Sequence, residues 1–280
     1  MNSRIISEEM LHDFETHLFN NEKSIQTIKK YLHDIKYFAG YADGREVDKS
    51  MVILYKASLE ESYALSSANS MIAAVNAFFR FLGWEDCCVR QFRIQKNVYC
   101  SEEKELTREE YFKLVKTAEK KGNKRLGLIL QTICGTGMRV SELQYITVEA
   151  VRKGEVSVSC KNKTRTIFIV RDLQKKLQKY IAEKDIESGY VFMTRSGKPI
   201  DRSNIWKEMK ALCEEAGIIA DKVFPHNLRH LFARVFYNIE KDIAKLADIL
   251  GHTSINTTRI YIITTGSEHR KKLESMHLII

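Results

Sequence analysis

A permanent cation, Arg139, follows a strongly apolar segment of the chain. Leucine and isoleucine fill five of the nine positions from Leu126 to Cys134, a density that predicts a buried helix. Gly135 and Gly137 are expected to end this helix and to let the backbone turn sharply. A guanidinium just after the end of a core helix indicates a bound anion, because arginine stays charged and offers paired N–H donors to carboxylate or phosphate oxygens.

Three other short stretches also carry polar residues in unusual settings. They are CKNKTR with Lys161, PHNLRH with His226 and Arg229, and LGHTSINTTRIY with His252 and Tyr261. Lysine and arginine bind anions, and histidine exchanges protons near neutral pH. The four stretches therefore form the candidate site.

Each stretch alone also has an ordinary structural explanation. Arg139 could form a surface ion pair with Glu142, three residues on. The lysine turn could be a solvated hairpin tip, and His226 could cap a helix that starts at Pro225. His230, four residues after His226, could be one wall of a metal site. A short motif by itself therefore does not decide the function.

Together, the four stretches resemble the motifs of the tyrosine recombinase (phage integrase) family in order, spacing and context. TGMRVSEL matches the family's first arginine motif, with Met138 where leucine is usual, and HNLRH matches its His-x-x-Arg box. CKNKTR resembles the family's lysine-bearing β-hairpin, one residue shorter than common versions, and LGHTSINTTRIY matches the closing motif. The resemblance spans about residues 105–265 and is looser over the helical front half. It points to an Xer-like, simple site-specific recombinase.

The resemblance implies a catalytic set of six residues, which are Arg139, Lys161, His226, Arg229, His252 and Tyr261. The guanidiniums of Arg139 and Arg229 would hydrogen-bond the non-bridging oxygens of a DNA phosphodiester, where negative charge grows during attack. Tyr261 would attack the phosphorus, and His226 would serve as base or proton acceptor. A base is needed because only about one phenol in a thousand is ionised at pH 7.

Two further roles complete the implied reaction. Lys161 would donate a proton to the departing 5′-oxygen, with Lys163 as the alternative general acid, and His252 would hydrogen-bond a non-bridging oxygen. The product would be a 3′-phosphotyrosyl link, which conserves the energy of the broken bond. Rejoining would then need neither ATP nor a metal ion, so no cofactor and no metal are expected.

Two folded halves are expected to position these residues. Residues 7–83 show four amphipathic segments with short connections, which predict a helical bundle, and the polar residues 96–104 predict a linker. Beyond the linker, strand-like segments at 154–160 and 165–170 flank a basic turn, and residues 189–194 could form a third strand. Helices are expected there at 171–183, 203–216, 227–239, 241–250 and 254–262.

The expected fold class is mainly α with a small antiparallel sheet. A four-helix core-DNA-binding bundle would occupy residues 1–95. An α+β tyrosine recombinase catalytic domain with a C-terminal tail would occupy residues 105–280.

The charge of the chain is unevenly distributed around a net charge of +9. Residues 1–100 hold 12 Lys+Arg against 13 Asp+Glu, whereas residues 101–280 hold 33 against 23. A basic half predicts a polyanion partner such as nucleic acid, although a charge that serves solubility is the alternative. The six cysteines form no Cys-x-x-Cys pair, and no apolar run approaches about 18 residues, so a reduced, cytoplasmic protein without a membrane span is expected.

Double-stranded DNA is the expected partner. Seven polar residues are candidate DNA contacts, namely Lys23, Thr27, Lys30, Ser67 and Asn69 in the front half and Lys163 and Arg165 in the hairpin. An ordinary solvated helix face is the alternative for the front-half residues. The resemblance implies a clamp around a duplex with a short inverted-repeat core site, and a tetramer on two duplexes. The tail, residues 267–280, could pack on a neighbouring subunit or on its own domain.

Two rival functions remain compatible with these motifs. A type IB-like topoisomerase uses similar chemistry as a monomer, and a relaxation assay without paired sites separates it from a recombinase. A non-catalytic DNA-binding protein on the same scaffold would bind DNA without forming a covalent adduct. The chain starts directly with the first bundle, which favours a recombinase that acts on short core sites. Integration, excision, inversion and dimer resolution stay open as outcomes.

Overall fold

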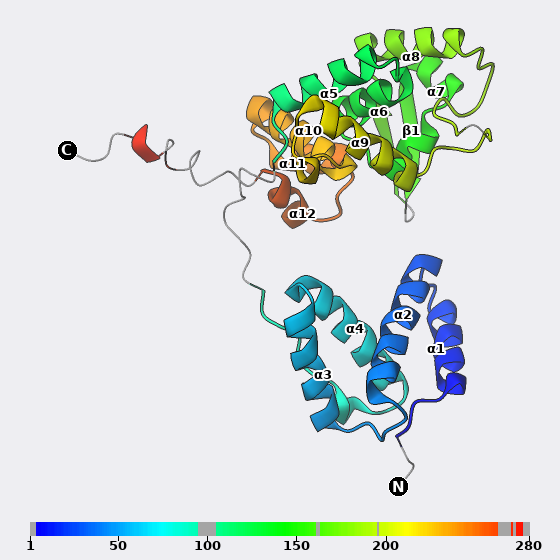
Figure 1. Cartoon of the computed structure of the whole chain (residues 1–280), viewed down its shortest axis with the longest axis vertical. Coiled ribbons are helices and arrows are strands. Elements are labelled where there is room, and N and C mark those ends of the chain that lie inside the picture. The colour runs from blue at the N-terminus through cyan, green and yellow to red at the C-terminus, as the bar shows by residue number, and fades with distance from the viewer. Residues whose placement is uncertain are drawn as a thin grey trace. The chain divides into compact units, whose positions relative to one another are not determined.

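The computed structural model describes residues 4–94, 105–160, 163–194, 196–262, 270 and 273–276. The chain separates into two units, residues 1–96 and 97–280, and each has its own hydrophobic core (Figure 1). The predicted linker, residues 96–104, falls outside the described residues, so the domain boundaries stay a prediction. Within the described ranges, no helix is long and apolar enough to cross a membrane.

The N-terminal unit is a helical bundle, as the periodicity predicts. Its helices are α1 (Glu8–Asn20), α2 (Ile25–Ala42), α3 (Lys49–Ser62) and α4 (Leu65–Phe81), followed by the 3-10 turn η1 (Glu85–Cys87). Side-chain oxygens of Ser7, Ser24 and Asp48 cap the first three helices, because each accepts a hydrogen bond from a backbone N–H of the first turn. Polar residues at these positions therefore set where the helices begin.

Aromatic side chains fill the core of the bundle. The ring of Phe38 is buried and meets Tyr55 edge-on at 4.9 Å and Phe79 edge-on at 5.5 Å between centroids. Such edge-to-face pairs add a stabilisation of about 1 kcal/mol each to the burial of apolar area. These rings hold α2, α3 and α4 together, and they are not available to stack on DNA bases.

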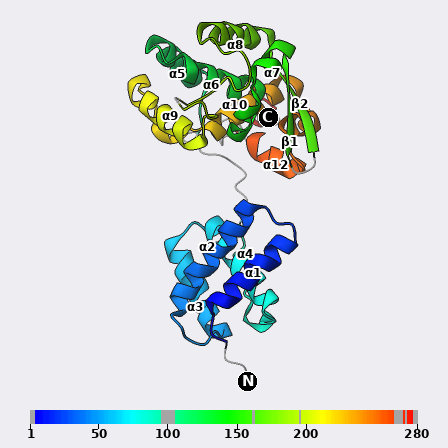
Figure 2. The same cartoon turned by 90° about the vertical axis from the view of Figure 1, so that its right-hand side faces the viewer.

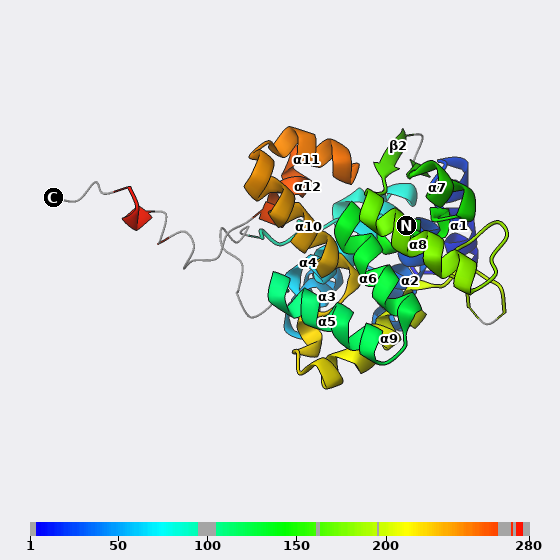
Figure 3. The same ribbon diagram turned by 90° about the horizontal axis from the view of Figure 1, so that it is seen from above.

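The C-terminal unit is built around the buried helix α6 (Lys124–Thr136). The helices that pack against it are α5 (Arg108–Lys120), α8 (Arg171–Glu183), α9 (Arg202–Ala216) and α10 (Pro225–Glu240). The remaining elements are the turn η3 (Val140–Tyr145), α7 (Val148–Lys153), β1 (Glu155–Cys160), β2 (Lys163–Phe168), the turn η4 (Ala220–Lys222), α11 (Ile243–Leu250), α12 (Ile255–Arg259) and the turn η5 (Ile260–Ile262). Figure 2 shows the β1–β2 hairpin at one edge beside α7, and Figure 3 shows α10, α11 and α12 grouped on one side of α6.

The sheet of this unit has two antiparallel strands. β1 pairs with β2 from Glu155↔Phe168 to Cys160↔Lys163, which confirms the predicted small antiparallel sheet. The predicted third strand at 189–194 is wrong for the described residues, because this segment makes only the isolated bridges Thr147↔Tyr190 and Met193↔Pro199. Its backbone groups bond to residues 146–148 and 198–200 instead of to the hairpin.

The helix before Arg139 is longer than the glycines suggest. α6 spans Lys124–Thr136 and passes through Gly135, so the expectation that Gly135 ends it is wrong. A glycine inside a helix costs about 1 kcal/mol, which burial of the apolar face outweighs. Gly137 does end the helix, because it adopts the left-handed conformation at φ 66° and donates its N–H to the carbonyl of Ile133. Only the second glycine therefore turns the chain towards Arg139.

The two glycines predict opposite stability effects when each is replaced by alanine. A Cβ on Gly137 would overlap the ring of Phe232 and would sit on a backbone with positive φ. A Cβ on Gly135 would meet only Leu173 Cδ2, at 3.8 Å, in a helical backbone. We expect Gly137→Ala to lower the free energy of unfolding by about 2 kcal/mol and Gly135→Ala to raise it by about 0.5 kcal/mol, measured by urea denaturation. Equal effects of the two changes would contradict this account.

Candidate active site

Three candidate side chains come from the first turns of α10. Pro225 occupies the first helical position after Phe224, where the missing N–H of proline removes no helical hydrogen bond. His226, Arg229 and His230 follow at positions i, i+3 and i+4, which share one face of a helix. The local sequence therefore aims all three residues at the same region.

The guanidinium of Arg229 is buried, with 1% of the residue exposed. Its Nη1 donates to the carbonyl of Gly137 at 2.6 Å, and its Nη2 donates to the carbonyl of Leu250 at 2.6 Å. Its Nε has no hydrogen-bond partner among the described residues. Burial, and then the charge of Arg139, lower the pKa of Arg229 to about 10, which leaves it charged at neutral pH. A buried cation with an unpaired donor is suited to receive an anion.

The C-terminal end of α11 positions three arginines. The consecutive carbonyls of residues 249–251 accept hydrogen bonds, in chain order, from Arg165, Arg229 and Arg139. Helix C-termini leave carbonyls without intrahelical partners and carry partial negative charge, so they attract cations. Gly251 permits this close approach, because its φ is 63° and a Cβ there would lie 2.6 Å from Arg165 Cδ. One helix end thus aligns guanidiniums from three separate segments.

Glu142 supports the arginine cluster from the side of η3. Its buried carboxylate accepts from the backbone N–H of Arg139 at 2.6 Å, from Arg139 Nη1 at 3.0 Å and from Arg165 Nη2 at 2.6 Å. The ion pair offered as the ordinary explanation of Arg139 is therefore formed, yet the Arg139 side chain stays 39% exposed. Sequence reasoning did not include Glu142 in the site, although its spacing from Arg139 was a usable signal.

Tyr261 lies against the histidines of α10. The residue is 5% exposed, and its hydroxyl is 3.2 Å from His226 Nε2. Its ring stacks on His230 with centroids 4.1 Å apart and an interplanar angle of 15°. The Arg229 guanidinium lies 5.9 Å from the centre of the same ring. The candidate nucleophile, base and buried cation therefore meet within one unit of one chain.

His252 joins Arg229 to the segment that carries Tyr261. Its Nε2 lies 3.0 Å from Arg229 Nη2, and its Nδ1 lies 2.9 Å from the hydroxyl of Thr258. The rings of His252 and Tyr261 are 5.0 Å apart between centroids. Five of the six predicted catalytic side chains are thus brought together.

The site histidines are held in the neutral form. Burial, followed by the charges of Arg229 and Arg139, lowers the pKa of His226 and lowers that of His252 to about 4. Burial, followed by the neighbouring His226 and Arg229, lowers the pKa of His230 to about 4. A neutral His226 can accept a proton from a phenol at pH 7.

Sequence reasoning missed the place of His230 beside Tyr261. It considered His230 only as one wall of a metal site, and the described residues contain no group of three His, Cys, Asp or Glu that could hold a metal ion. The available signal was the i+4 spacing from His226, which puts both rings on one face. The stacking on Tyr261 depends on the position of η5, which local spacing does not reveal.

The lowered histidine pKa values predict a loss of stability in mild acid. In the unfolded chain His230 and His252 titrate near pH 6.5, and in the folded chain near 4, so the unfolded state binds more protons between these values. Their contribution to stability is complete above about pH 6.5 and is lost as the pH falls towards 4. We expect the free energy of unfolding, measured with urea, to fall by about 1 kcal/mol per pH unit through His230, and by less through the partly exposed His252.

A His230→Phe variant is the control for this pH dependence. Phenylalanine keeps an aromatic ring against Tyr261 but does not titrate, so the stability of the variant should depend less on pH than that of the wild type. Identical slopes for the two proteins would show that His230 does not carry the effect.

The structure describes the side chains of Arg165 and Asn69 but not those of the other two hairpin candidates. Lys161 lies outside the described residues, and Lys163 begins β2 with its side chain outside them as well. Arg165 is directed into the arginine cluster, with 15% of its side chain exposed. The amide of Asn69 bonds to the backbone of Phe92, with Nδ2 donating to the carbonyl at 2.9 Å and Oδ1 accepting from the N–H at 2.7 Å. Arg165 and Asn69 therefore each have hydrogen-bond partners within the protein.

The other front-half candidates lie on the surface of the bundle. Lys23 is exposed, and the hydroxyl of Thr27 lies 2.8 Å from that of Ser24, which caps α2. Lys30 and Ser67 line one hollow of about 370 Å³ between α2 and α4. Lys30 forms an ion pair with the buried carboxylate of Asp34, which lines the same hollow. All seven residues stay predicted DNA contacts.

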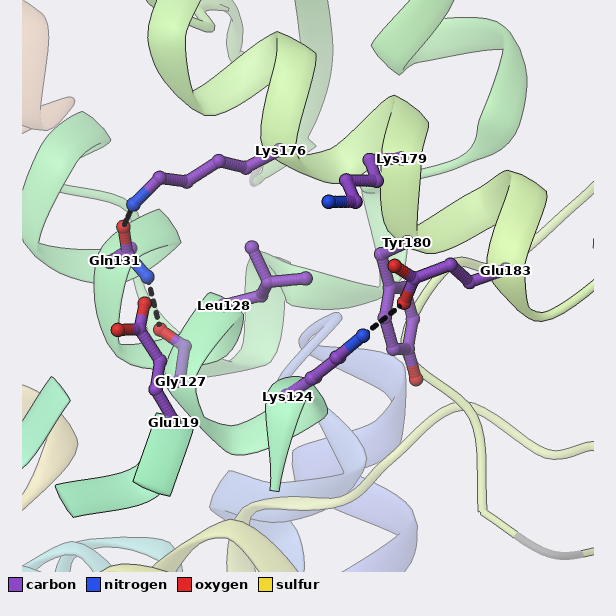
Figure 4. Close-up of a pocket in the computed structure, with 9 residues that line it drawn as sticks. All are labelled: Glu119, Lys124, Gly127, Leu128, Gln131, Lys176, Lys179, Tyr180 and Glu183. Carbon is purple, nitrogen blue, oxygen red and sulfur yellow. Dashed lines mark hydrogen bonds and ion pairs between the residues drawn. The ribbon is translucent and has the colours of Figure 1, made fainter. Parts of the chain in front are cut away.

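A separate hollow of about 240 Å³ lies between α5, α6 and α8 (Figure 4). Leu128 and Tyr180 form its apolar floor, and a salt bridge of 2.7 Å between Lys124 and Glu183 crosses its rim. None of the predicted catalytic or DNA-binding residues lines this hollow. Figure 1 shows α8 on the side of the C-terminal unit opposite α12. The hollow is therefore distinct from the site around Tyr261.

Comparison with known proteins relates both halves of the chain to one family. Residues 104–267 match the phage integrase family, and residues 11–86 match the family described as phage integrase, N-terminal SAM-like domain. Tyrosine recombinase XerA of Pyrococcus furiosus is 30% identical over 289 residues, covering 100% of this chain and 98% of its own length. Tyrosine recombinase XerD of Halalkalibacterium halodurans is 28% identical, covering 91% of this chain and 92% of its own.

Solved structures show the same fold. The crystal structure of XerA recombinase aligns with a TM-score of 0.55 and 25% identity, covering 97% of this chain and 99% of that one. A lambda integrase dimer bound to a COC′ core site aligns with a TM-score of 0.75 and 17% identity, covering 93% of this chain and 96% of that one. The predicted fold class is confirmed by these neighbours.

Proposed function

The chain belongs to the phage integrase family and is a tyrosine recombinase, and from this premise we propose that it cuts and rejoins double-stranded DNA at a specific site through a phosphotyrosyl intermediate on Tyr261. The placement of the Tyr261 hydroxyl 3.2 Å from a neutral His226, beside the buried Arg229, carries this proposal. Nucleophile, base and anion-binding cation are the minimum set for attack on a phosphodiester.

The proposed reaction exchanges one phosphorus–oxygen bond for another. The Tyr261 oxygen forms a bond to phosphorus while its proton passes to His226, and the bond to the 5′-oxygen breaks. Arg139, Arg229 and His252 hydrogen-bond the non-bridging oxygens, whose negative charge grows during attack. Lys161, or Lys163 in its place, supplies the proton that makes the departing oxygen a free 5′-hydroxyl. Attack by another 5′-hydroxyl on the 3′-phosphotyrosyl bond then rejoins the DNA without ATP or a metal ion.

The arginine cluster suits a phosphodiester better than a neutral substrate. The guanidiniums of Arg139 and Arg165 bind the buried carboxylate of Glu142, whereas that of Arg229 bonds to the carbonyl of Leu250. Three cations against one carboxylate leave the cluster with an excess of positive charge. Guanidinium groups bind phosphate through two parallel hydrogen bonds, and they act here in a partly dehydrated setting. The protein holds these groups in place before DNA arrives, so little reorganisation is needed in the transition state.

The proposed assembly is a tetramer on two duplexes, each with a short inverted-repeat core site. A lambda integrase tetramer bound to a Holliday junction shares this fold, with a TM-score of 0.73. The front-half unit would bind the duplex through Lys30 and Ser67, and the basic C-terminal unit would hold the cleavage site. The predicted tail contact, within residues 267–280, lies largely outside the described residues. Action on DNA in the cytoplasm is part of the same proposal.

Covalent capture tests the proposed function. The wild-type protein is incubated with fragmented genomic DNA of its source organism, and adducts that survive detergent are digested and sequenced. Mass spectrometry should find a nucleotide 3′-phosphate on the peptide that contains Tyr261, and a plasmid with two copies of the captured sequence should recombine. Relaxation of plasmids without exchange between paired sites would favour a topoisomerase. Binding without any adduct would favour the non-catalytic alternative.

A further inference from the structure

A buried hydroxyl group lies behind the candidate site and is not used by the reaction as described. Thr258 lies on α12, three residues before Tyr261, and its relative exposure is 0%. Its Oγ1 is 2.9 Å from His252 Nδ1. Valine has nearly the same shape, so packing alone does not require an oxygen there. The hydroxyl therefore has a polar role towards the histidine.

The contacts of His252 determine which of its ring nitrogens carries the proton. Arg229 can only donate hydrogen bonds, and its Nη2 lies 3.0 Å from His252 Nε2, so Nε2 accepts. A neutral imidazole carries one proton, which therefore sits on Nδ1 and is donated to the Thr258 oxygen. In the DNA-free protein His252 thus presents a lone pair, rather than a proton, towards the place proposed for the phosphate.

Binding of a phosphodiester requires the opposite arrangement. A non-bridging oxygen accepts hydrogen bonds, so His252 can contact it only with a proton on Nε2. Nδ1 must then either keep its own proton and donate to Thr258, or lose it and accept from the Thr258 hydroxyl. A hydroxyl is both donor and acceptor, so it serves both of these states. Water cannot take over this task, because Thr258 is inaccessible to solvent.

We propose that Thr258 is a positioning residue that allows His252 to change from hydrogen-bond acceptor to hydrogen-bond donor at Nε2 when a phosphate oxygen binds. The role of His252 on the phosphate rests on the proposed function. Thr258 itself touches neither DNA nor the reacting atoms. Its hydroxyl gives His252 Nδ1 a hydrogen-bond partner whether Nδ1 is protonated or not, which an apolar side chain cannot do.

Three variants separate this role from packing. Thr258→Val removes the hydroxyl and keeps the shape, Thr258→Ser keeps the hydroxyl and removes a methyl group, and Thr257→Val makes the matched change on the exposed neighbour. The assay is single-turnover adduct formation on a duplex of the captured sequence, with DNA affinity measured in parallel. We expect about 10- to 100-fold slower cleavage for Thr258→Val, and rates within about threefold of the wild type for the other two. DNA affinity should change by less than about twofold in each variant.

Nitrogen NMR of histidine-labelled protein provides a direct readout of the proton position. At pH 7.5 the wild type should show a protonated Nδ1 and an unprotonated Nε2 for His252, assigned with a His252→Gln sample. Addition of inorganic sulfate should bring a proton to Nε2 in the wild type and in Thr258→Ser, but not in Thr258→Val. An Nε2 already protonated without sulfate, or wild-type cleavage by Thr258→Val, would overturn the role of Thr258.

Failure of the two proposals can be told apart. A wild type that forms no adduct contradicts the recombinase reaction, whereas the NMR measurement needs no catalysis and still decides the role of Thr258. A wild type that cleaves, together with Thr258→Val that cleaves equally well, leaves the recombinase reaction in place and removes only the role of Thr258.

Discussion

Tyr261→Phe is expected to abolish covalent attachment of the protein to DNA while DNA binding persists. The change removes only the hydroxyl, whose partner is His226 Nε2 at 3.2 Å, and the remaining ring can still stack on His230. Without an oxygen nucleophile, adduct formation should fall by at least about 10⁴-fold, as when the nucleophile of other enzymes is removed. Covalent attachment is measured as detergent-resistant adducts on a labelled duplex. DNA binding is measured from the electrophoretic mobility of the complex.

Tyr190→Phe is the matched control for this prediction, because Tyr190 is 41% exposed and lies outside the site. It should form adducts at the wild-type rate. Adducts that persist in Tyr261→Phe would assign the nucleophile to another residue. Loss of DNA binding in the same variant would show instead that the hydroxyl supports the fold or the DNA contact.

Arg229→Lys is expected to cause the second-largest loss of activity, although it preserves the charge. The guanidinium uses two nitrogens at once, towards the carbonyls of Gly137 and Leu250, and one of these also reaches His252. An ammonium group cannot reproduce this planar fork, so a carbonyl buried with Arg229 loses its donor. We expect cleavage about 10³-fold slower, because loss of one oriented donor to a transition-state oxygen already costs about 10²- to 10³-fold.

Stability measurements separate the structural part of this effect from the catalytic part. The buried position of Arg229 predicts a decrease of about 2–3 kcal/mol in the free energy of unfolding for Arg229→Lys, measured with urea. Arg152→Lys, on the exposed last turn of α7, is the control and should change neither rate nor stability. A variant that is destabilised but cleaves at the wild-type rate would show that Arg229 serves only the fold.

Much of the fold was predictable because its signals are local. The predicted helix at 171–183 coincides with α8, and the four amphipathic segments predicted within residues 7–83 form α1 to α4, since apolar residues recur at helical spacing in these segments. Capping residues also act on their own first turn, as the reciprocal hydrogen bonds of Thr107 and Glu110 show at the start of α5. Hairpin strands were likewise visible from their β-branched residues. None of these features depends on distant parts of the chain.

The two wrong sequence predictions concern segments where contacts with distant parts of the chain override the local conformational preference. Gly135 looks like a helix end but stays helical, because the apolar face of α6 is buried on several sides. Residues 189–194 look like a strand, yet the N–H of Val191 donates to the carbonyl of Ile146 and the carbonyl of Phe192 accepts from the N–H of Ile200. In both cases burial or backbone pairing outside the segment decides the conformation.

The sequence by itself determined which residue types could act on a phosphodiester, and in what order, since each motif is short and depends on its own neighbours. Only the tertiary structure decided how these residues meet. The end of α11 gathers arginines from positions 139, 165 and 229, and Tyr261 stacks on His230 from another element. The physical reason is that a helix terminus offers carbonyls to whichever donors packing brings near, and packing of buried apolar surfaces joins segments that no local pattern relates.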